Sequence, residues 1–384
     1  MLLLLYFTFV TLVYILALPL LLFLSFKKKY KSSIPARFFL YKNPPFKKKD
    51  AIWFHACSLG EVNALKVIIN QIKDVHVNFS VITQTGFKSA KTIENIGLRY
   101  LPFEVFLPFW IRKQKVLVVL EAELWPMLFV ISKLRGTKTI LLNARISDNS
   151  YNSYKKFAFF YRWIFSYVDK VFAQSELDKQ RLLELGAKNV VVNGNIKTLS
   201  IPTVSKKYKK PSSQVLTLAS THEGEEELLL ENLLLPQACT LIVVPRHPER
   251  FESVDQLLRK YAKTKGKSYS RLSENELLNT DIVLCDKMGE LVNIYAITDI
   301  TYLGGSFKEG IGGHNPLEPA FFNNKIISGE YFFNQFPLYK LVKNIKVCLR
   351  EELKSLNYDL VEKSEVLYQG EMDSLLQELK ENVE

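Results

Sequence analysis

The chain has 384 residues, too many for one compact core, and this length predicts two domains of ordinary size with a short appendage. Hydrophobic residues make up 48% of the chain and charged residues 23%, a balance that excludes an intrinsically disordered protein. The formal net charge of +12 favours acidic substrates or an anionic membrane surface, and the sequence shows no arginine-rich recognition helix or aromatic RNP-like motif that would indicate nucleic acid as a partner.

The first 26 residues contain no charged side chain, and a segment rich in lysine and proline, residues 27–50, follows directly. A helix of that length is long enough to cross a hydrocarbon core of roughly 30 Å. A cleaved signal peptide is the alternative, but it usually has a basic start and a shorter apolar region. We therefore predict a single transmembrane anchor at 1–26 and a basic connector at 27–50, with the main body on the cytoplasmic face.

From residue 51 onwards, short apolar runs alternate with amphipathic stretches. The predicted strands are Ala51–His55, Phe79–Thr83, Val116–Leu120, Thr139–Leu142, Lys170–Ala173, Val190–Val192, Val215–Ala219, Leu241–Val244, Ile282–Leu284, Ile300–Leu303 and Lys325–Ile327. One amphipathic stretch, Ser175–Leu185, has the capping serine and closing glycine of a helix. This alternation predicts an α/β fold with parallel sheets.

A polar and basic segment with two prolines, residues 200–213, separates two such series of strands. It predicts a linker between an N-terminal domain at 51–199 and a C-terminal domain at 214–384, whose last helix is free to pack back on the first domain. Two doubly wound domains place a ligand cleft between the carboxyl ends of their strands.

The sequence HACSLGE follows the first predicted strand and opens a helix, so Glu61 is a candidate general base for an acceptor hydroxyl. Ser58 and Glu61 also have the S-x-x-E spacing of a capping box. The spacing alone favours the capping role over catalysis.

Glu121 and Glu123 follow the strand Val116–Leu120, at the edge where open α/β sheets bind ligands. The two carboxylates would point the same way if the strand continued, which would give a site with paired acids. It is an equally good interpretation that one of these acids lies in a loop and the other caps a helix before Pro126. Lys197 is a further candidate near the linker, although a solvated lysine is more common.

Polar and glycine-rich turns follow several strands of the second half, and together they favour a nucleotide site. Arg246 offers a fixed cation for a phosphate or carboxylate. Glu290 and Glu318 are carboxylates that could accept from ribose hydroxyls. The segments concerned are Pro245 and Arg246, then Met288, Gly289 and Glu290, then Asn315, Pro316, Leu317 and Glu318.

The four cysteines are scattered, and the five histidines form no HxxH or HxxxH pair. The sequence also lacks an Asp-x-Asp motif. We therefore expect neither a disulfide framework nor a metal site. Two aromatic stretches with basic residues, 101–111 and 151–168, could contact lipid or pack inside the domain.

Nine motifs resemble, in this order, those of bacterial 3-deoxy-D-manno-octulosonic acid (Kdo) transferases: HACSLGE, EAELWP, NARISDNSYNSYKKF, AQSELD, GNIK, ASTHEGEEE, PRHPERF, MGEL and GGHNPLEPA. The resemblance implies a GT-B fold, in which two Rossmann-like domains face a cleft. It implies acceptor binding in the N-terminal domain and CMP-sugar binding in the C-terminal one. The transfer would be inverting and independent of metal, with CMP-Kdo as donor, a lipid A precursor (lipid IVA) as acceptor and no cofactor.

Through this resemblance Glu61 matches the general base of the family, and that role then outweighs capping. An acid of the ELWP motif, either Glu121 or Glu123, and Lys197 match positions that stabilise the transition state. The segments around Arg246, Met288–Glu290 and Asn315–Glu318 match those that contact CMP. Leu59 and Met127 depart from the valine and asparagine that are usual in the family.

The resemblance implies an enzyme of lipopolysaccharide biosynthesis on the cytoplasmic face of the bacterial inner membrane. Other GT-B transferases that use a UDP-sugar, and sugar-nucleotide epimerases of the same fold, are the alternatives. A membrane-tethered binding protein with an inactive site is a third. The number of Kdo residues transferred, the acyl-chain preference and the oligomeric state are open at the level of sequence.

Overall fold

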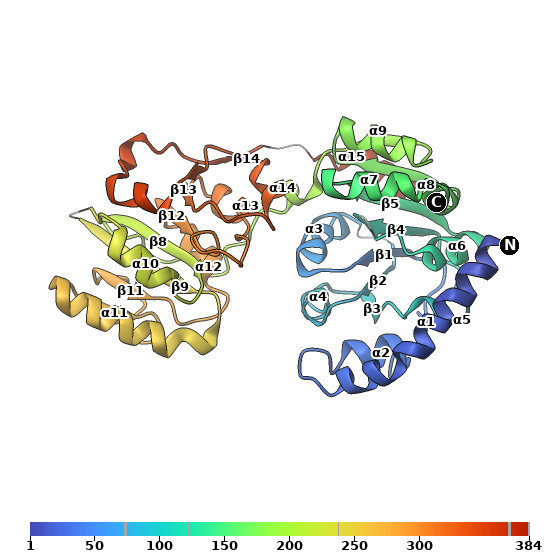
Figure 1. The fold of residues 1–384 in the computed structure, drawn as a ribbon, viewed down its shortest axis with the longest axis horizontal. Coiled ribbons are helices and arrows are strands. Elements are labelled where there is room, and N and C mark those ends of the chain that lie inside the picture. Colours follow the sequence, from blue (N-terminus) through green and yellow to red (C-terminus); the bar gives the residue numbers. More distant parts are fainter. Residues whose placement is uncertain (73–74, 122, 237, 368–369, 383–384) are drawn as a thin grey trace. The chain divides into compact units, whose positions relative to one another are not determined.

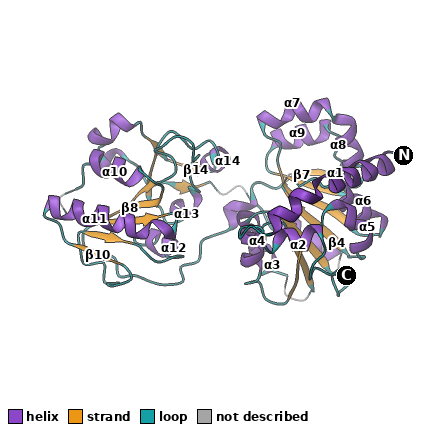
Figure 2. Cartoon of the chain, turned by 60° about the horizontal axis from the view of Figure 1, so that its bottom comes forward, coloured by secondary structure: helices purple, strands orange, loops and turns teal. Residues whose placement is uncertain are grey.

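A computed structural model describes all residues except 73–74, 122, 237, 368–369 and 383–384. The chain divides into two compact units: unit 1 comprises Met1–Ser200 and Gln369–Glu384, and unit 2 comprises Ile201–Tyr368. Each unit has a parallel sheet covered by helices (Figures 1 and 2), as the α/β prediction requires. The segment 201–213, all of it described, forms neither helix nor strand.

The sheet of unit 1 has the order β3-β2-β1-β4-β5-β6-β7 in the described part of the chain, with all neighbours parallel. Its strands are β1 (Ile52–Ala56), β2 (Val77–Val81), β3 (Ile96–Tyr100), β4 (Val116–Leu120), β5 (Lys138–Ala144), β6 (Lys170–Ala173) and β7 (Val190–Val192). The chain builds outward from β1 to β3 and then returns to place β4 on the other side of β1. The loops after β1 and β4 therefore diverge at the carboxyl edge, which is where open sheets bind ligands.

Helices cover both faces of this sheet. They are α1 (Leu2–Ser25), α2 (Ser33–Phe38), α3 (Leu59–Ile69), α4 (Gln84–Ala90), α5 (Leu107–Trp110), α6 (Pro126–Leu134), α7 (Asp148–Lys156), α8 (Ala158–Phe165), α9 (Glu176–Glu184) and α15 (Asp373–Glu381), with 3-10 turns η1 (Glu104–Phe106) and η2 (Ile196–Leu199). Alternate strand residues separate two cores: Phe54 packs with α3, α4 and α15, whereas Trp53 packs with α5, α6, α8 and α9. The C-terminal helix thus completes the core of unit 1.

The sheet of unit 2 repeats the same plan, with the order β10-β11-β9-β8-β12-β13-β15 among the described residues. Its strands are β8 (Gln214–Thr221), β9 (Cys239–Pro245), β10 (Tyr269–Arg271), β11 (Ile282–Leu284), β12 (Ile300–Leu303), β13 (Lys325–Ser328) and β15 (Lys346–Val347), and β14 (Val342–Lys343) pairs antiparallel with β16 (Glu365–Val366). Its helices are α10 (Glu225–Asn232), α11 (Phe251–Lys265), α12 (Leu291–Tyr295), α13 (Leu317–Ala320) and α14 (Phe336–Tyr339), with η3 (Pro248–Arg250), η4 (Arg350–Ser355) and η5 (Tyr358–Leu360). The reversal of strand order now lies between β8 and β12.

Helix α1, 24 residues long, is the one helix in the described part of the chain whose length and composition suit a membrane span. Half of its residues are exposed, and Leu16 reaches 81%. One stripe nevertheless packs on unit 1: the Tyr6 hydroxyl donates to the Glu104 carboxylate, and that of Tyr14 donates to the Phe38 carbonyl at 2.7 Å. Helix α1 is therefore attached to unit 1 along its N-terminal half.

Of the two aromatic stretches, 101–111 is mostly buried, whereas 151–168 is largely exposed or half-buried. In 101–111, Leu107 and Trp110 are buried in the core, whereas Phe109 is 81% exposed. In 151–168, Phe165 is buried and Phe159 is 63% exposed. Each stretch therefore contributes to the core and leaves isolated aromatic rings on the surface.

Candidate functional site

The loops that leave β1 and β4 carry the acidic candidates of unit 1. Ser58 caps α3, and its hydroxyl accepts from the Glu61 N–H at 3.4 Å. The same hydroxyl donates to Glu61 Oε1 at 2.6 Å, and the backbone N–H of Cys57 donates to Oε2 at 2.8 Å. The contacts between Ser58 and Glu61 thus cap α3 and orient the Glu61 carboxylate at the same time. Because its two hydrogen bonds fix its position, the Glu61 carboxylate is held at the start of α3 in a single orientation.

Glu61 is only 6% exposed, and this burial raises the pKa of its carboxyl above the ordinary 4.5. The hydrogen bonds from Ser58 and Cys57 oppose the rise, the negative charge of Glu121 adds to it, and the positive charge of Lys197 reduces it. A carboxylate with a raised pKa accepts a proton more readily than an exposed one does. The environment of Glu61 therefore suits a general base.

Glu121 follows the last residue of β4 in a left-handed backbone conformation, with φ of +59°. Its carboxylate forms an ion pair with Lys197 and accepts from the Asn143 side chain at 3.4 Å. Asn143, at the end of β5, is also left-handed (φ +58°) and accepts from the Ile196 N–H at 3.1 Å. The charges of Glu121 and Lys197 both act on the pKa of Glu61. The structure therefore brings Glu61, Glu121 and Lys197 together.

Glu123 has other partners than that pair. Strand β4 ends at Leu120, so the alternation of a strand does not extend to Glu123, and Ala122 lies outside the described residues. Its carboxylate accepts from the Trp125 indole at 2.6 Å. Burial and then Glu123 raise the pKa of the nearby Cys57 thiol. Glu121 and Glu123 therefore do not form the paired-acid arrangement considered from sequence.

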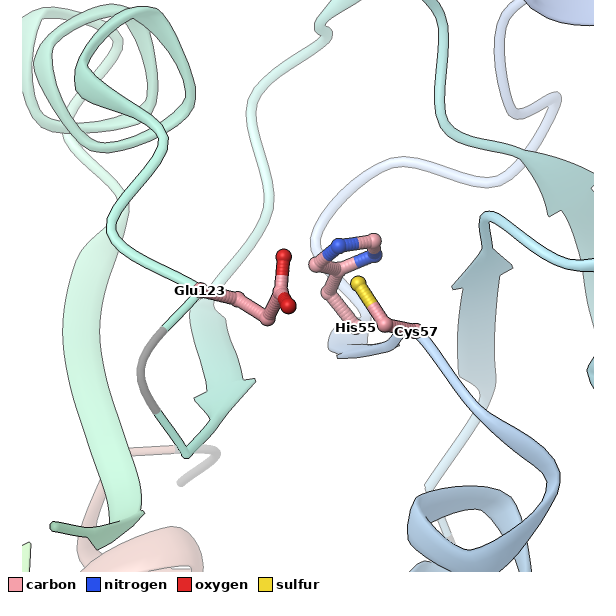
Figure 3. Close-up of side chains that lie close together, drawn as sticks. All are labelled: His55, Cys57 and Glu123. Atoms are coloured by element: carbon pink, nitrogen blue, oxygen red, sulfur yellow. The ribbon is translucent and has the colours of Figure 1, made fainter. Parts of the chain in front are cut away.

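His55, Cys57 and Glu123 form a compact group that the sequence motifs did not single out (Figure 3). One potential ligand atom from each lies within 4.8 Å of the others. His55 Nδ1 contacts the Ser80 hydroxyl at 2.8 Å, whereas its buried Nε2 has no hydrogen-bond partner among the described residues. Burial, and secondly the charge of Arg37, lower the pKa of His55 to about 3, so the imidazole is neutral.

In unit 2, Arg246 directly follows β9, and its backbone N–H donates to the Thr221 carbonyl at the end of β8 at 3.0 Å. Its side chain is exposed and forms no hydrogen bond or ion pair in the described part of the chain. Burial raises the pKa of Glu318 and lowers that of two nearby histidines, His222 and His314; the guanidinium charge opposes the first shift and adds to the other two. An accessible cation at this edge of the sheet suits an anionic ligand.

Three histidines surround this edge, and sequence analysis did not connect them. His222 Nε2 lies 2.9 Å from His314 Nε2, and their rings stack at 5.1 Å. The ring of His247 lies 5.3 Å from that of His222. Burial, followed by the charges of His222 and Arg246, lowers the pKa of His314 to about 3. The sequence feature that could have connected these histidines is that each follows a strand of the same sheet, β8, β9 or β12.

The glycine-rich turns lie at the same edge. The Asn315 side chain accepts from the Leu317 N–H at 3.0 Å and donates to Glu318 at 3.4 Å, while Pro316 precedes α13. Burial raises the pKa of Glu318. At Gly304 a Cβ atom would lie 2.6 Å from the Ser220 carbonyl, so β8 and the loop after β12 approach too closely for any side chain.

The segment after β11 differs from the other two. Gly289 has φ of +88° and Met288 is 63% exposed. Glu290 is already engaged, because its Oε2 accepts from the Tyr208 hydroxyl at 2.9 Å and from the Asn293 amide at 2.8 Å. Its carboxylate is therefore held in place by two residues of unit 2, one from segment 201–213 and one from α12.

Comparison with known proteins identifies the family. A sequence-family profile described as 3-Deoxy-D-manno-octulosonic-acid transferase (kdotransferase) matches residues 32–200. A 3-deoxy-D-manno-octulosonic acid transferase from Haemophilus influenzae is 32% identical over 350 residues, which are 84% of this chain and 80% of that protein. A bifunctional glycosyltransferase/methyltransferase from Fusobacterium nucleatum is 34% identical over 80% of this chain, which spans about half (51%) of that longer protein.

Solved structures agree on the fold. A UDP-GlcNAc 2-epimerase from Neisseria meningitidis bound to UDP-GlcNAc has a TM-score of 0.52 at 14% identity, with 79% of this chain and 89% of that one covered. The likeness concerns the fold alone, and it confirms the GT-B prediction. The C-terminal CMP-Kdo binding domain of WaaA from Acinetobacter baumannii is 32% identical, with a TM-score of 0.32, over 37% of this chain and 77% of that domain. The sequence motifs, the matching family profile and the similarity to the Haemophilus protein show that the chain belongs to the 3-deoxy-D-manno-octulosonic acid transferase family.

Proposed function

We propose that this chain is an inverting glycosyltransferase that moves Kdo from CMP-Kdo to a lipid A precursor such as lipid IVA. The observation that carries this proposal is the position of Glu61. Its carboxylate is buried at the carboxyl edge of β1, fixed by two hydrogen bonds and adjacent to the Glu121–Lys197 ion pair. A base at this edge, in a chain of this family, supports a direct displacement.

In the proposed step, Glu61 accepts the proton of an acceptor hydroxyl while the hydroxyl oxygen attacks the anomeric carbon of Kdo. The bond between that carbon and the phosphate oxygen breaks, and CMP leaves with the bonding electrons. One displacement inverts the configuration at the anomeric carbon. Ser58 and the Cys57 N–H keep the Glu61 carboxylate in one orientation before the acceptor arrives, which reduces the cost of reaching the reactive geometry.

Lys197 supplies a positive charge next to the base. Its ion pair with Glu121 holds the ammonium in place, and the left-handed backbone at Glu121 directs that carboxylate toward it. We assign to Lys197 the stabilisation of negative charge that develops in the transition state. Glu121 is then a positioning residue, and Glu123, which contacts Trp125 instead, is not assigned a part in transfer.

Unit 2 would bind the CMP portion of the donor. Arg246 would contact the phosphate, because an exposed guanidinium favours an anion. Glu318 would accept from a ribose hydroxyl or a base amino group. Met288, Gly289 and Glu290 would line the nucleotide, with Glu290 positioned by Tyr208 and Asn293.

We further propose that α1 anchors the protein to the bacterial inner membrane with both units on the cytoplasmic face. The exposed apolar side chains of α1 and the lysines at 27–31 support this orientation. A full span would require the contacts of Tyr6 and Tyr14 with unit 1 to be released. The ring of Phe109 and that of Phe159, both on unit 1, would then meet the lipid surface. Segment 201–213 would act as the linker between an acceptor-binding and a donor-binding domain.

The test is transfer from CMP-Kdo, generated in situ, to lipid IVA in detergent, with no divalent metal added in the transfer step. A mass gain of one or more Kdo units by mass spectrometry is the expected result, and its size counts the additions. Excess CMP should inhibit and excess UDP should not. No mass gain with CMP binding intact would refute this acceptor or sugar, and inhibition by UDP alone would favour a UDP-sugar enzyme.

A further inference from the structure

His55, Cys57 and Glu123 have the composition and the spacing of a three-ligand metal site. Imidazole, thiolate and carboxylate are the three protein ligands of Zn²⁺, and a site with three of them leaves one position open. Ligand atoms of a tetrahedral Zn²⁺ ion lie roughly 3.5 Å apart. In this chain the candidate atoms already lie within 4.8 Å of one another, so a rearrangement of about 1 Å closes the site.

The unsatisfied nitrogen of His55 is the second observation. A buried polar atom without a partner costs free energy, and native structures rarely tolerate one. His55 is fully buried, its Nδ1 contacts Ser80, and its Nε2 has no partner within the described residues. The Ser80 contacts hold the ring in one orientation, which is how a metal-binding histidine is usually fixed. Figure 3 shows the imidazole together with the Cys57 and Glu123 side chains.

An ion can also reach this group. Cys57 and Glu123 are partly exposed, so the thiol and the carboxylate connect the buried imidazole with solvent. Adjacent strands supply the ligands: His55 and Cys57 come from β1 and the loop after it, and Glu123 from the loop after β4. The sequence search for HxxH and CxxC missed the group because its members join neighbouring strands and not one helix or turn.

We propose that His55, Cys57 and Glu123 form a binding site for a thiophilic divalent cation of the Zn²⁺ class, a property that does not depend on the transfer reaction. On binding, the Cys57 thiol releases one proton to solvent, and the bonds formed are one from each of the three side chains to the ion. The two negative ligands balance the double charge of the ion.

Arg37 is the charge that opposes binding. It lies close enough to Cys57, Glu123 and His55 for their charges to affect one another. Its Nε donates to the Leu101 carbonyl at 3.0 Å, so the guanidinium is tied in place. Repulsion by Arg37 should weaken the site, and removal of this charge should therefore tighten it.

The experiment is titration of the full-length protein in detergent with Co²⁺, a spectroscopic substitute for Zn²⁺. We expect a thiolate-to-cobalt charge-transfer absorption that Zn²⁺ displaces. Cys57→Ser should abolish this absorption, and Glu123→Gln should weaken Co²⁺ binding by about tenfold or more. Cys239→Ser, a change to a buried cysteine of unit 2, is the matched control and should leave the spectrum unchanged.

A further variant separates binding from loss of structure. Arg37→Met should strengthen Co²⁺ binding severalfold, a change that a damaged fold would not produce. Absence of the charge-transfer absorption at saturating Co²⁺, or its persistence in Cys57→Ser, would overturn the proposal. Weaker binding by Arg37→Met with a native circular-dichroism spectrum would also contradict it.

Discussion

The two units share one strand plan and differ in the charge that they place on it. At the carboxyl edge of its sheet, unit 1 carries Glu61 and Glu121, with Lys197 paired to the latter. At the corresponding edge, unit 2 carries Arg246 and a set of histidines. The architecture fixes where the loops meet, whereas the residues in the loops decide which ligand the edge suits. On the proposed mechanism, unit 1 accepts a proton and unit 2 holds an anion.

The largest expected effect tests the acidic edge. Glu61→Gln should reduce kcat for transfer by roughly 10²–10⁴-fold, since general bases contribute that much. The glutamine oxygen can still accept from Ser58 or the Cys57 N–H, so the cap of α3 and CMP affinity should persist. Steady-state kinetics and CMP titration measure the two effects. Glu176→Gln, at an exposed position of α9, is the matched control, and near-wild-type turnover by Glu61→Gln would remove it from the role of base.

The second prediction removes the positive charge from the carboxyl edge of the sheet in unit 2. Arg246→Met should weaken CMP binding by about tenfold to a hundredfold, because a hydrogen bond to a charged group is worth about 1.5–3 kcal/mol. Calorimetric titration with CMP measures this loss. Arg259→Met, at a helix-surface ion pair, should bind CMP normally. If Arg246→Met and Arg259→Met bound CMP equally well, the charge of Arg246 would not be what suits the sheet edge of unit 2 to an anion.

The pH dependence of transfer sharpens the account of unit 1. A general base must be deprotonated to act, so activity should be lost as pH falls through the Glu61 pKa. Because burial raises this pKa, the acidic limb of the pH–rate profile should lie above pH 4.5. Lys197 lowers and Glu121 raises this pKa. Lys197→Met should therefore move the acidic limb of the profile to higher pH, and Glu121→Gln should move it to lower pH. Shifts in the same direction for both variants would contradict the proposed charge arrangement.

The smallest expected effect concerns acid stability, where the units resemble each other. His314 in unit 2 and His55 in unit 1 both have a pKa of about 3, well below the ordinary 6.5, because they are buried. The unfolded chain binds their protons below pH 6.5 and the folded chain does not. Stability should thus be full above that pH and fall as pH drops from 6.5 toward 3. Between pH 7.5 and pH 5, the melting temperature of His314→Gln should fall by less than that of the wild-type protein.

Much of the fold was predictable because buried parallel strands are nearly continuous apolar runs. The predicted strands Val116–Leu120, Lys170–Ala173, Ile282–Leu284 and Ile300–Leu303 coincide with those observed. Strand β3 was missed because it is a partly exposed edge strand with a glycine and an arginine. Short edge strands such as β10 and β15 carry equally little apolar signal.

The site was predictable only as far as motifs follow strands. The resemblance proposed Glu61, Lys197 and Arg246 as site residues, but neither spacing nor resemblance could separate Glu121 from Glu123. That separation depends on where β4 ends and on the left-handed backbone at Glu121. The contacts of His55 with Cys57 and Glu123 depend on strand adjacency, which a single sequence does not state.

The return of α15 to unit 1 has a consequence for synthesis. Leu375 and Leu379 fill the core beside α3, and Glu378 pairs with Lys138 and Lys170, so this unit is closed by its last helix. All of unit 2 is translated in between, which takes roughly 10–30 s at the usual rates. Throughout that interval the nascent unit 1 exposes an open apolar slot on its sheet. The growing chain should therefore depend on chaperones at this stage, and release from them should coincide with the arrival of the final turns.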